Sequence, residues 1–209
     1  MHEMREKILD AAVDEFSRFG VRSVTMDDIA RHLGISKKTL YQEFSDKKEL
    51  VKSAFERILN EDQCKLDEIM NSSDDQVIET LVSISRMMRH RLQSINPITI
   101  HEVQKYFPEA WSVFVRHKEE IILHELIEII ERGKKMGYFR SEIEAPILAR
   151  IRVDQITNAM ESANFQDKEY DIVKVQLEMM DHFLHGIFTE KGREAYKSQQ
   201  EKSVSNPEK

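Results

Sequence analysis

The segment from Thr25 to Leu50, TMDDIARHLGISKKTLYQEFSDKKEL, constrains the fold more than any other part of the chain. Thr25 has a side chain that caps helix N-termini, and the two aspartates after Met26 suit the positive end of a helix dipole. Gly34 can adopt the left-handed conformation that ends a helix, and Ser36 can cap the next one. The segment therefore predicts two short helices joined by a tight turn.

Basic side chains gather at the start of the second of these helices, predicted over residues 36–44. Leu40 and Phe44 lie four residues apart and would pack on one side, which leaves the polar side chains for the other. Lys37 and Lys38 open the helix, where its dipole disfavours a cation by roughly 0.3–1 kcal/mol. A phosphate or a guanine edge nearby would reverse that penalty; the alternative is a merely solvated face. The arrangement indicates a helix-turn-helix that contacts DNA.

Apolar residues at helical spacing predict that the rest of the chain is helical as well. A first helix is expected over 3–19, and Asp46 with Glu49 makes a capping-box pattern for a helix that runs to about Met70. Further segments are predicted near 75–93, up to Tyr106, 109–135, 146–163 and 169–188, with loops at 71–74 and 164–167. Glycine (6) and proline (4) are few, so the expected fold class is all-α.

The net charge of −7 is unevenly distributed. Residues 1–60 hold eleven basic and eleven acidic side chains, and the remainder holds twenty against twenty-seven. The stretch from Arg31 to Lys48 contains five basic side chains and two acidic ones. A local positive patch on an acidic body suits a protein that touches DNA with one small surface.

Several classes of protein are excluded or disfavoured by the same sequence. No apolar run is long enough to span a bilayer, the polar N-terminus does not resemble a signal peptide, and the single Cys64 fits a reducing compartment, so a soluble cytoplasmic protein is expected. There is no glycine-rich phosphate loop, nucleophile elbow or paired-cysteine motif, so neither an enzyme nor a cofactor is expected. His182 and His185, one turn after Glu178, fit an exposed helix face better than a metal site, and no metal is expected.

Residues 8–51 also resemble the N-terminal region of the TetR family of bacterial transcriptional repressors. The most specific part is the pattern G-[IV]-S-K-x-T-L-Y-x-x-F-x-x-K, here Gly34 to Lys47. The downstream residues match in helical layout and in the GYFR turn at Gly137–Arg140. The resemblance implies DNA contacts from Thr25, Lys37, Lys38, Thr39, Tyr41, Gln42 and Lys47.

Within that set, the resemblance implies that Tyr41 and Lys47 contact phosphates. The candidates for contacts with bases are Lys37, Lys38, Thr39 and Gln42. Two positions depart from the family pattern. Lys38 stands where a small residue is common, and Glu43 where His or Tyr is common. Glu43 could accept a hydrogen bond from a cytosine amino group, or it could face solvent, which is the favoured interpretation.

The resemblance further implies a helix-turn-helix domain over 1–51 and a helical effector-binding and dimerisation domain over 52–190. Residues 191–209 are polar and predicted to be disordered. Two C-terminal helices of each subunit would form a four-helix bundle, and the wide apolar faces of 146–163 and 169–188 agree with this, although an ordinary intramolecular core is the alternative. A homodimer would place two recognition helices roughly 34–36 Å apart on a palindromic operator.

A small-molecule effector bound within the second domain is the last expectation. Methionine and aromatic side chains offer an adaptable apolar lining, and a few polar side chains offer handles. The candidate residues are Met87, Met88, His101, Tyr106, Trp111, Phe114, Gln155 and Asn158. The predicted function is a repressor released by a hydrophobic ligand; the alternatives are an architectural or partner-binding DNA protein of the same fold without an effector, and an enzyme or interaction domain that merely carries the motif.

Overall fold

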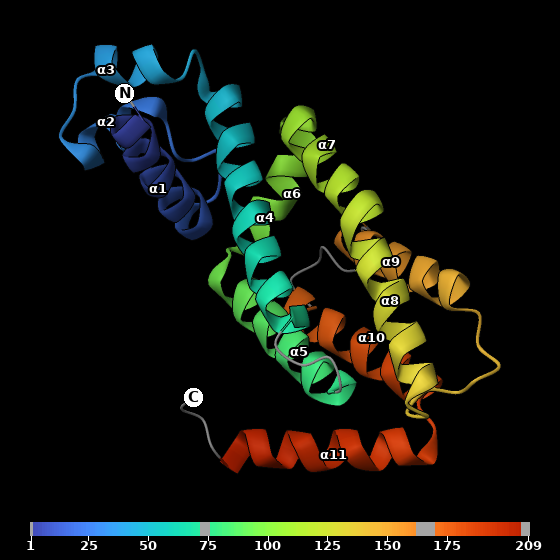
Figure 1. The fold of residues 1–209 in the computed structure, drawn as a ribbon. Coiled ribbons are helices and arrows are strands. Elements are labelled where there is room, and N and C mark those ends of the chain that lie inside the picture. The colour runs from blue at the N-terminus through green and yellow to red at the C-terminus, as the bar shows by residue number, and fades with distance from the viewer. Residues whose placement is uncertain (1, 72–75, 162–169, 206–209) are drawn as a thin grey trace. The chain divides into compact units, whose positions relative to one another are not determined.

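The computed structural model describes residues 2–71, 76–161 and 170–205, and these residues are almost entirely helical. The one β feature among them is an isolated bridge between Phe139 and Phe188. The predicted all-α class, with three short helices at the N-terminus, is confirmed. The elements (Figure 1) are α1 (His2–Phe19), α2 (Met26–Leu33), α3 (Lys37–Glu43), α4 (Lys47–Asn71), α5 (Val77–Ser94), α6 (Pro97–Tyr106), α7 (Pro108–His117), the π-helix η1 (Lys118–Ile122), α8 (Leu123–Lys135), α9 (Ala145–Glu161), α10 (Ile172–Ile187) and α11 (Glu190–Ser205).

The chain forms two compact units, each assembled from two stretches of sequence. The N-terminal unit comprises Met1–Cys64 and Leu92–His117, and the C-terminal unit comprises Lys65–Arg91 and Lys118–Lys209. The N-terminal unit thus contains α6 and α7 in addition to α1, α2, α3 and most of α4. The domain boundary predicted at residue 51 falls inside α4. The separate roles assigned to the two predicted domains remain predictions.

The N-terminal unit is held by a core to which all its helices contribute. Ile8, Ala12 and Phe16, spaced four residues apart on α1, are 0–4% exposed. They pack with Ile29, Ala30, Leu40, Phe44, Leu50, Val51, Val103 and Ala110 from α2, α3, α4, α6 and α7. Burial of this apolar surface is the main force that fixes α3 against its supporting helices.

Polar contacts also connect α6 to the loop that leads into α2. The Thr99 hydroxyl donates to the Phe16 carbonyl at 2.9 Å, and the Glu102 carboxylate accepts from the Arg22 backbone N–H at 2.8 Å. Both α6 side chains are at most 8% exposed. Because buried polar groups are costly unless paired, these bonds fix α6 in one position on the unit.

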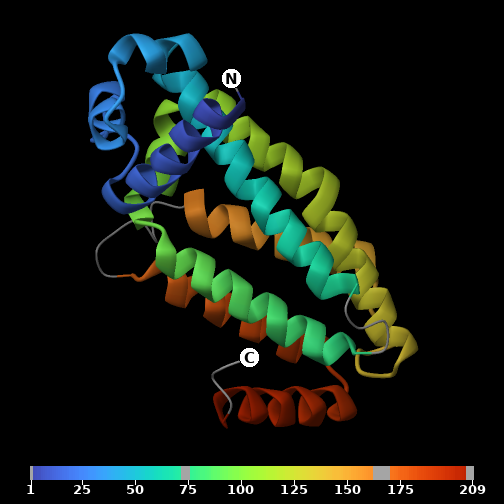
Figure 2. The ribbon, with the colours of Figure 1, turned by 60° about the vertical axis from the view of Figure 1, so that its left-hand side comes forward.

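The C-terminal unit has a separate core around α5, α8, α9 and α10, and α5 and α10 lie side by side (Figure 2). An aromatic group made of Phe139, Phe188 and Tyr196 connects the turn after α8 to α10 and α11, with ring centroids 5.7 Å and 5.2 Å apart along the series. Gly133 lets the Phe139 ring lie against α8, since a Cβ there would be 2.2 Å from a ring carbon.

The prediction of disorder after residue 190 is wrong for most of that segment, because α11 is a helix over Glu190–Ser205. Tyr196 is 5% exposed against the Phe188 ring, and the Thr189 hydroxyl accepts from the Gly192 N–H at 3.1 Å, as a helix cap does. One anchoring side chain in a polar helix produces no visible periodicity. Residues 206–209 lie outside the described residues, as do the predicted loop at 164–167 and most of the break at 71–74.

The predicted continuous helix over 109–135 is interrupted. It consists of α7, five residues of π-helix at Lys118–Ile122 and then α8. π-helical turns arise where an extra residue is accommodated within a helix, and single-sequence periodicity does not reveal them.

Candidate nucleic-acid interface

The start of α2 is fixed by a reciprocal capping box. The Thr25 hydroxyl accepts from the Asp28 N–H at 3.2 Å, while the Asp28 carboxylate accepts from the Thr25 N–H at 3.0 Å. Hydrogen bonds from Thr25 lower the pKa of the Asp28 carboxyl below its usual value. The predicted cap at Thr25 is confirmed, and its partner Asp28 was predicted only as a dipole-compatible charge.

The turn between α2 and α3 depends on Gly34. Its φ of 65° lies in the left-handed region, which side chains other than glycine rarely adopt. The Ile35 N–H donates to the Ala30 carbonyl at 3.0 Å and closes the turn. Ser36 then caps α3 by accepting from the Thr39 N–H at 3.1 Å, as predicted.

One face of α3 is buried and the other is exposed, as the sequence indicated. Leu40 and the residue that ends the helix, Phe44, are fully buried. Lys38 and Gln42 are exposed, and Tyr41 is 49% exposed despite its size. An aromatic ring held in solvent on a short, capped helix is available for a partner, although its contact with DNA remains a prediction.

Four predicted DNA contacts have protein partners here. The Thr25 hydroxyl donates to the Asp28 carboxylate at 2.6 Å. The Lys37 ammonium pairs with the Asp27 carboxylate, and the Thr39 hydroxyl lies 2.8 Å from that of Ser36. Lys47 donates to the Arg22 carbonyl at 3.3 Å. Burial lowers the pKa of Lys47, so this side chain is partly withdrawn from solvent.

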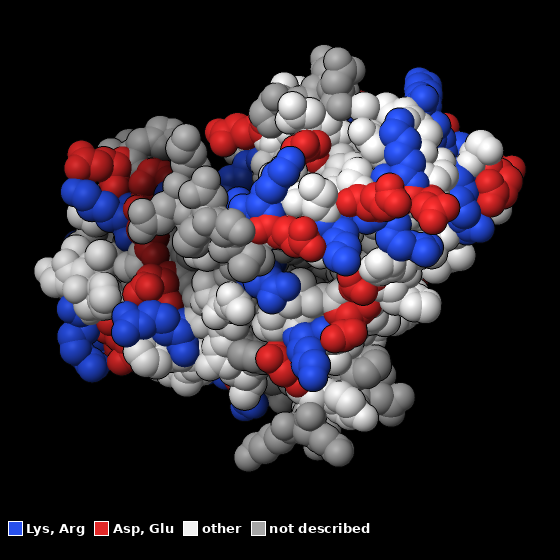
Figure 3. All heavy atoms as spheres, turned by 90° about the horizontal axis from the view of Figure 1, so that it is seen from below, with Lys and Arg blue, Asp and Glu red and all other residues white. Residues whose placement is uncertain are grey.

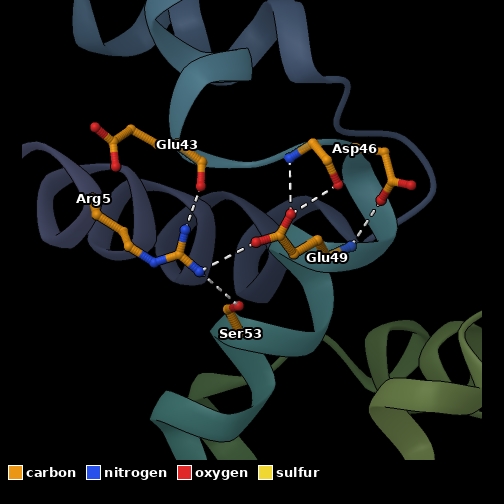
Figure 4. A network of polar contacts seen from close by, with 6 residues as sticks. Arg5, Glu43, Asp46, Glu49 and Ser53 are labelled. Carbon is orange, nitrogen blue, oxygen red and sulfur yellow. Dashed lines mark hydrogen bonds and ion pairs between the residues drawn. The ribbon is translucent and has the colours of Figure 1, made fainter.

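Arg5 of α1 ties down the far end of α3 (Figure 4). One guanidinium nitrogen donates to the Glu43 carbonyl, and the other lies 3.4 Å from the Glu49 carboxylate and 3.5 Å from the Ser53 hydroxyl. The guanidinium carbon stands 4.0 Å from the centroid of the Phe44 ring. These contacts fix the orientation of α3 relative to α1 and α4. No pattern in the sequence identified Arg5.

The capping arrangement at α4 differs in part from the predicted one. The Asp46 carboxylate accepts from the Glu49 N–H at 2.9 Å, as expected. The Glu49 carboxylate does not return this bond to Asp46, because it accepts from the N–H and the hydroxyl of Ser45, both at 2.8 Å. These bonds from Ser45 lower the pKa of Glu49.

The eight candidate effector residues fall into two groups. His101, Tyr106, Trp111 and Phe114 belong to the N-terminal unit, and Met87, Met88, Gln155 and Asn158 belong to the C-terminal unit. The ring centroids of Trp111 and Phe114 are 4.9 Å apart, so these two are brought together.

Individual members of that set differ in exposure. Tyr106 is 40% exposed and stacks under the Arg22 guanidinium at 4.4 Å, and Asn158 is exposed. Nδ1 of His101 and Oε1 of Gln155 are buried without a hydrogen-bond partner among the described residues. Among the eight candidates, His101 and Gln155 therefore each have a buried polar atom without a hydrogen bond in the described residues. That the eight residues bind an effector remains a prediction.

Two further observations apply to the described ranges. No group of three or more His, Cys, Asp or Glu side chains within them could hold a metal ion. None of the helices described there is long and apolar enough to cross a membrane. On the face drawn in Figure 3, acidic and basic side chains are interspersed.

Comparison with known proteins agrees with this geometry. Residues 8–54 match the family model described as bacterial regulatory proteins, tetR family. YhgD of Bacillus subtilis, an uncharacterized HTH-type transcriptional regulator, is 37% identical over 144 residues, which are 68% of each chain. The HTH-type transcriptional repressor KstR2 of Rhodococcus jostii is 28% identical over 152 residues, or 72% of this chain and 74% of that protein.

A solved structure of a transcriptional regulator from Saccharomonospora viridis in complex with choline shares the fold, with a TM-score of 0.68 at 20% identity. The match covers 90% of this chain and 100% of that one. The capped helix-turn-helix, the family match across it and the extended similarity to YhgD lead to one conclusion. The chain belongs to the TetR family of bacterial DNA-binding transcriptional regulators.

Proposed function

We propose that the protein is a repressor that binds a palindromic operator as a homodimer in the cytoplasm and is released by a small ligand with an apolar body. The observation that carries the DNA-binding part is the solvent-facing side of α3. It presents Lys38, Tyr41 and Gln42 from a helix that is capped at Ser36 and fixed by Arg5.

The proposed contacts follow from the chemistry of these side chains. The amide of Gln42 suits the paired donor and acceptor of adenine, and lysine ammonium groups suit the acceptors of guanine. Tyr41 and Lys47 would donate to phosphates on either side of the groove, and phosphate contacts set the register in which bases are read. Lys37 would exchange its pair with Asp27 for a contact with DNA.

The proposal of a dimer is supported by the outer face of α9. Ile147 and Ile151, one turn apart, are 59% and 46% exposed. Ala145 and Ala149 face the core of the unit, so the two isoleucines have no covering element among the described residues of that unit. A second copy of the chain would bury them, and large apolar side chains in such positions commonly mark an interface.

Release by a ligand is proposed on energetic grounds. A ligand that prefers one spacing of the two recognition helices shifts the population toward that spacing, by no more than its difference in affinity for the two states. The S. viridis regulator of the same fold binds choline, which shows that the fold can hold a small molecule.

The DNA proposal is tested by selecting bound sequences from random duplexes and then measuring affinity against salt concentration. Separate Lys37→Ala, Lys38→Ala and Tyr41→Ala variants are expected to bind the selected duplex more weakly. The salt slope should fall by about 0.9 wherever a phosphate contact is lost. Lys7→Ala removes a lysine that pairs with Glu3 on α1 and serves as the matched control. Unchanged specific affinity in all three α3 variants would refute the assignment.

The dimer is tested by light scattering on the full chain. Wild-type protein is expected to have the mass of two chains, and Ile151→Lys the mass of one, because a lysine cannot be buried there without a partner. Ile98→Lys, at a position 50% exposed in the N-terminal unit, is the control and should leave the mass unchanged. A monomeric wild-type protein would defeat this part of the proposal.

A further inference from the structure

Arg152 of α9 is a buried cation with no counter-charge among the described residues. Its side chain belongs to a residue only 8% exposed, and its Nη1 atom is buried without a hydrogen-bond partner among the described residues. The neighbouring Arg150 behaves differently, because it lies at the surface of α9 and pairs with the Glu119 carboxylate. Natural proteins rarely bury an arginine unless something pairs with it.

The charge of Arg152 persists at neutral pH. Burial lowers the pKa of its guanidinium to about 10, and no acidic side chain in the described part of the chain opposes that effect. A group with this pKa is still protonated in the cell. The C-terminal unit therefore carries an interior positive charge that an anion would stabilise.

The position of Arg152 on α9 indicates from which side such an anion must come. At 3.6 residues per turn, Arg152 projects within about 20° of Ala145, which is fully buried in the core. Ile147 and Ile151, on the exposed face, project roughly 100–140° away. A second copy docked on the isoleucine face would not reach the guanidinium, and an anion that paired with it would lie inside the protomer.

Other side chains around this part of α9 are also polar. Gln155 follows Arg152 by three residues and has its Oε1 buried without a donor in the described parts of the chain. From α10, Gln176 is 5% exposed and donates to the Ile156 carbonyl at 3.0 Å. The contiguous apolar core of the unit includes α9 only as far as Ala149. Beyond Ala149, the buried side chains of α9 are both apolar and polar. Val153 and Ala159 are 0% and 1% exposed, and Arg152 and Thr157 are each 8% exposed, so this surface is suited to a molecule with apolar and polar groups.

Apolar, adaptable side chains lie close to this polar group. Met180 follows Gln176 by one turn of α10, and its sulfur is 3.5 Å from the Ser85 hydroxyl of α5. Met88 follows Ser85 by three residues, which places it on the same side of α5. Unbranched thioether side chains adjust readily to an aliphatic body.

We propose that Arg152 binds the anionic head of an amphipathic effector, a carboxylate or a phosphate, while Gln155 accepts a hydrogen bond from a donor beside that head. The aliphatic body of the effector lies along the methionines of α5 and α10. This inference rests on the proposed ligand-responsive function and names the chemical class of the ligand.

The test is calorimetric titration of the full-length protein with defined probes below their micelle concentrations. The probes are straight-chain carboxylates from hexanoate to hexadecanoate, the alkyl phosphates of the same lengths, and the matching primary alcohols. At least one anionic series is expected to bind at least about tenfold more tightly than the alcohols, and the comparison of the two anionic series identifies the head group. Absence of binding by every anion would overturn the inference.

Two variants assign the effect to the guanidinium. Arg152→Met keeps the length of the side chain and removes its charge, so it should lose at least about tenfold in affinity for the anion and little for the alcohol. Arg150→Met, the matched control, should retain the affinity of the wild type. Equal losses in both variants, or none in Arg152→Met, would overturn the assignment.

Thermal unfolding without ligand supplies a second reading that does not require binding. Arg152→Met should melt at a higher temperature than the wild type, because it removes an uncompensated buried charge, whereas Arg150→Met loses an ion pair and should not. A lower melting temperature for Arg152→Met would show that an internal partner already satisfies the arginine, and would refute the inference.

Operator binding is measured separately so that the two proposals fail independently. If an anion binds through Arg152 but leaves the operator complex intact, the ligand assignment stands and the proposed release does not. If only neutral probes bind and they release the operator, the proposed function stands and the anionic class is refuted.

Discussion

Replacing Arg5 with Met tests how strongly α1 determines the position of the recognition helix. The change removes a guanidinium hydrogen bond to the Glu43 carbonyl, worth about 1–1.5 kcal/mol. It also removes a half-exposed pair with Glu49, worth about 0–1 kcal/mol, and stacking on the Phe44 ring, worth about 0.5–1 kcal/mol. Methionine keeps most of the packing of the aliphatic stem. The expected loss in unfolding free energy is about 2–3 kcal/mol.

Urea denaturation followed by fluorescence measures this loss, because the single tryptophan, Trp111, lies in the N-terminal unit. The midpoint should fall by about 1–2 M. Arg18→Met is the matched control. Arg18 is also on α1, and its side chain pairs with Asp14 at 3.3 Å and lies over the Phe19 ring at 5.2 Å, with no bond to another helix among the described residues. Equal midpoints for the two variants would refute the reasoning, since the difference between them is the connection to α3.

Three further changes are predicted to have measurable effects. Asp27→Asn should raise operator affinity by up to about fivefold in fluorescence anisotropy, because it frees Lys37 from an exposed ion pair worth up to about 1 kcal/mol. Glu49→Gln should be less stable than the wild type in urea at neutral pH. The difference should shrink as the pH falls below 4.5 and disappear below the lowered pKa of Glu49, because the carboxyl is then protonated in both the folded and the unfolded protein. Gly192→Ala should destabilise α11 by about 1–3 kcal/mol and speed its hydrogen exchange, because a Cβ would lie 2.1 Å from the Tyr138 carbonyl oxygen.

Each of these changes has its own control. Asp14→Asn removes a comparable exposed charge from α1, and an equal gain in affinity would mean that Asp27 acts only through the general field. A Glu49→Gln difference that persists unchanged at low pH would rule out the carboxylate charge as its cause. Gly186→Ala adds a methyl group where nothing lies within 4 Å, so it should be neutral or stabilising, and matching losses at both glycines would contradict the steric argument.

The features that could be predicted from the sequence depend on interactions between residues that are close together in the chain. The caps at Thr25 and Ser36 and the packed side of α3 follow from residues within four positions of one another, and all were predicted. Arg5 meets Glu43 across 38 positions, and no local pattern announces such a contact.

The incorrect prediction for α11 has the same cause. Its helix is mostly polar, with an ordinary composition for an unstructured tail, and its order depends on Tyr196 reaching Phe188. Arg152 was likewise passed over, because a charged residue in an amphipathic helix is normally placed on the solvent side. Its burial depends on how α9 packs against the core of the unit.

The discontinuous composition of the N-terminal unit has a consequence for how the protein is made. Its core requires Val103 and Ala110, and its loop before α2 requires Glu102, so the helix-turn-helix cannot reach its final packing when residue 64 leaves the ribosome. Synthesis must continue to residue 117, which takes about 3–10 s at bacterial elongation rates. During that interval the apolar sides of α1 and α4 lack their α6 and α7 partners and are open to chaperones. Pausing of translation in this window should therefore affect the yield of active regulator more than pausing later in the chain.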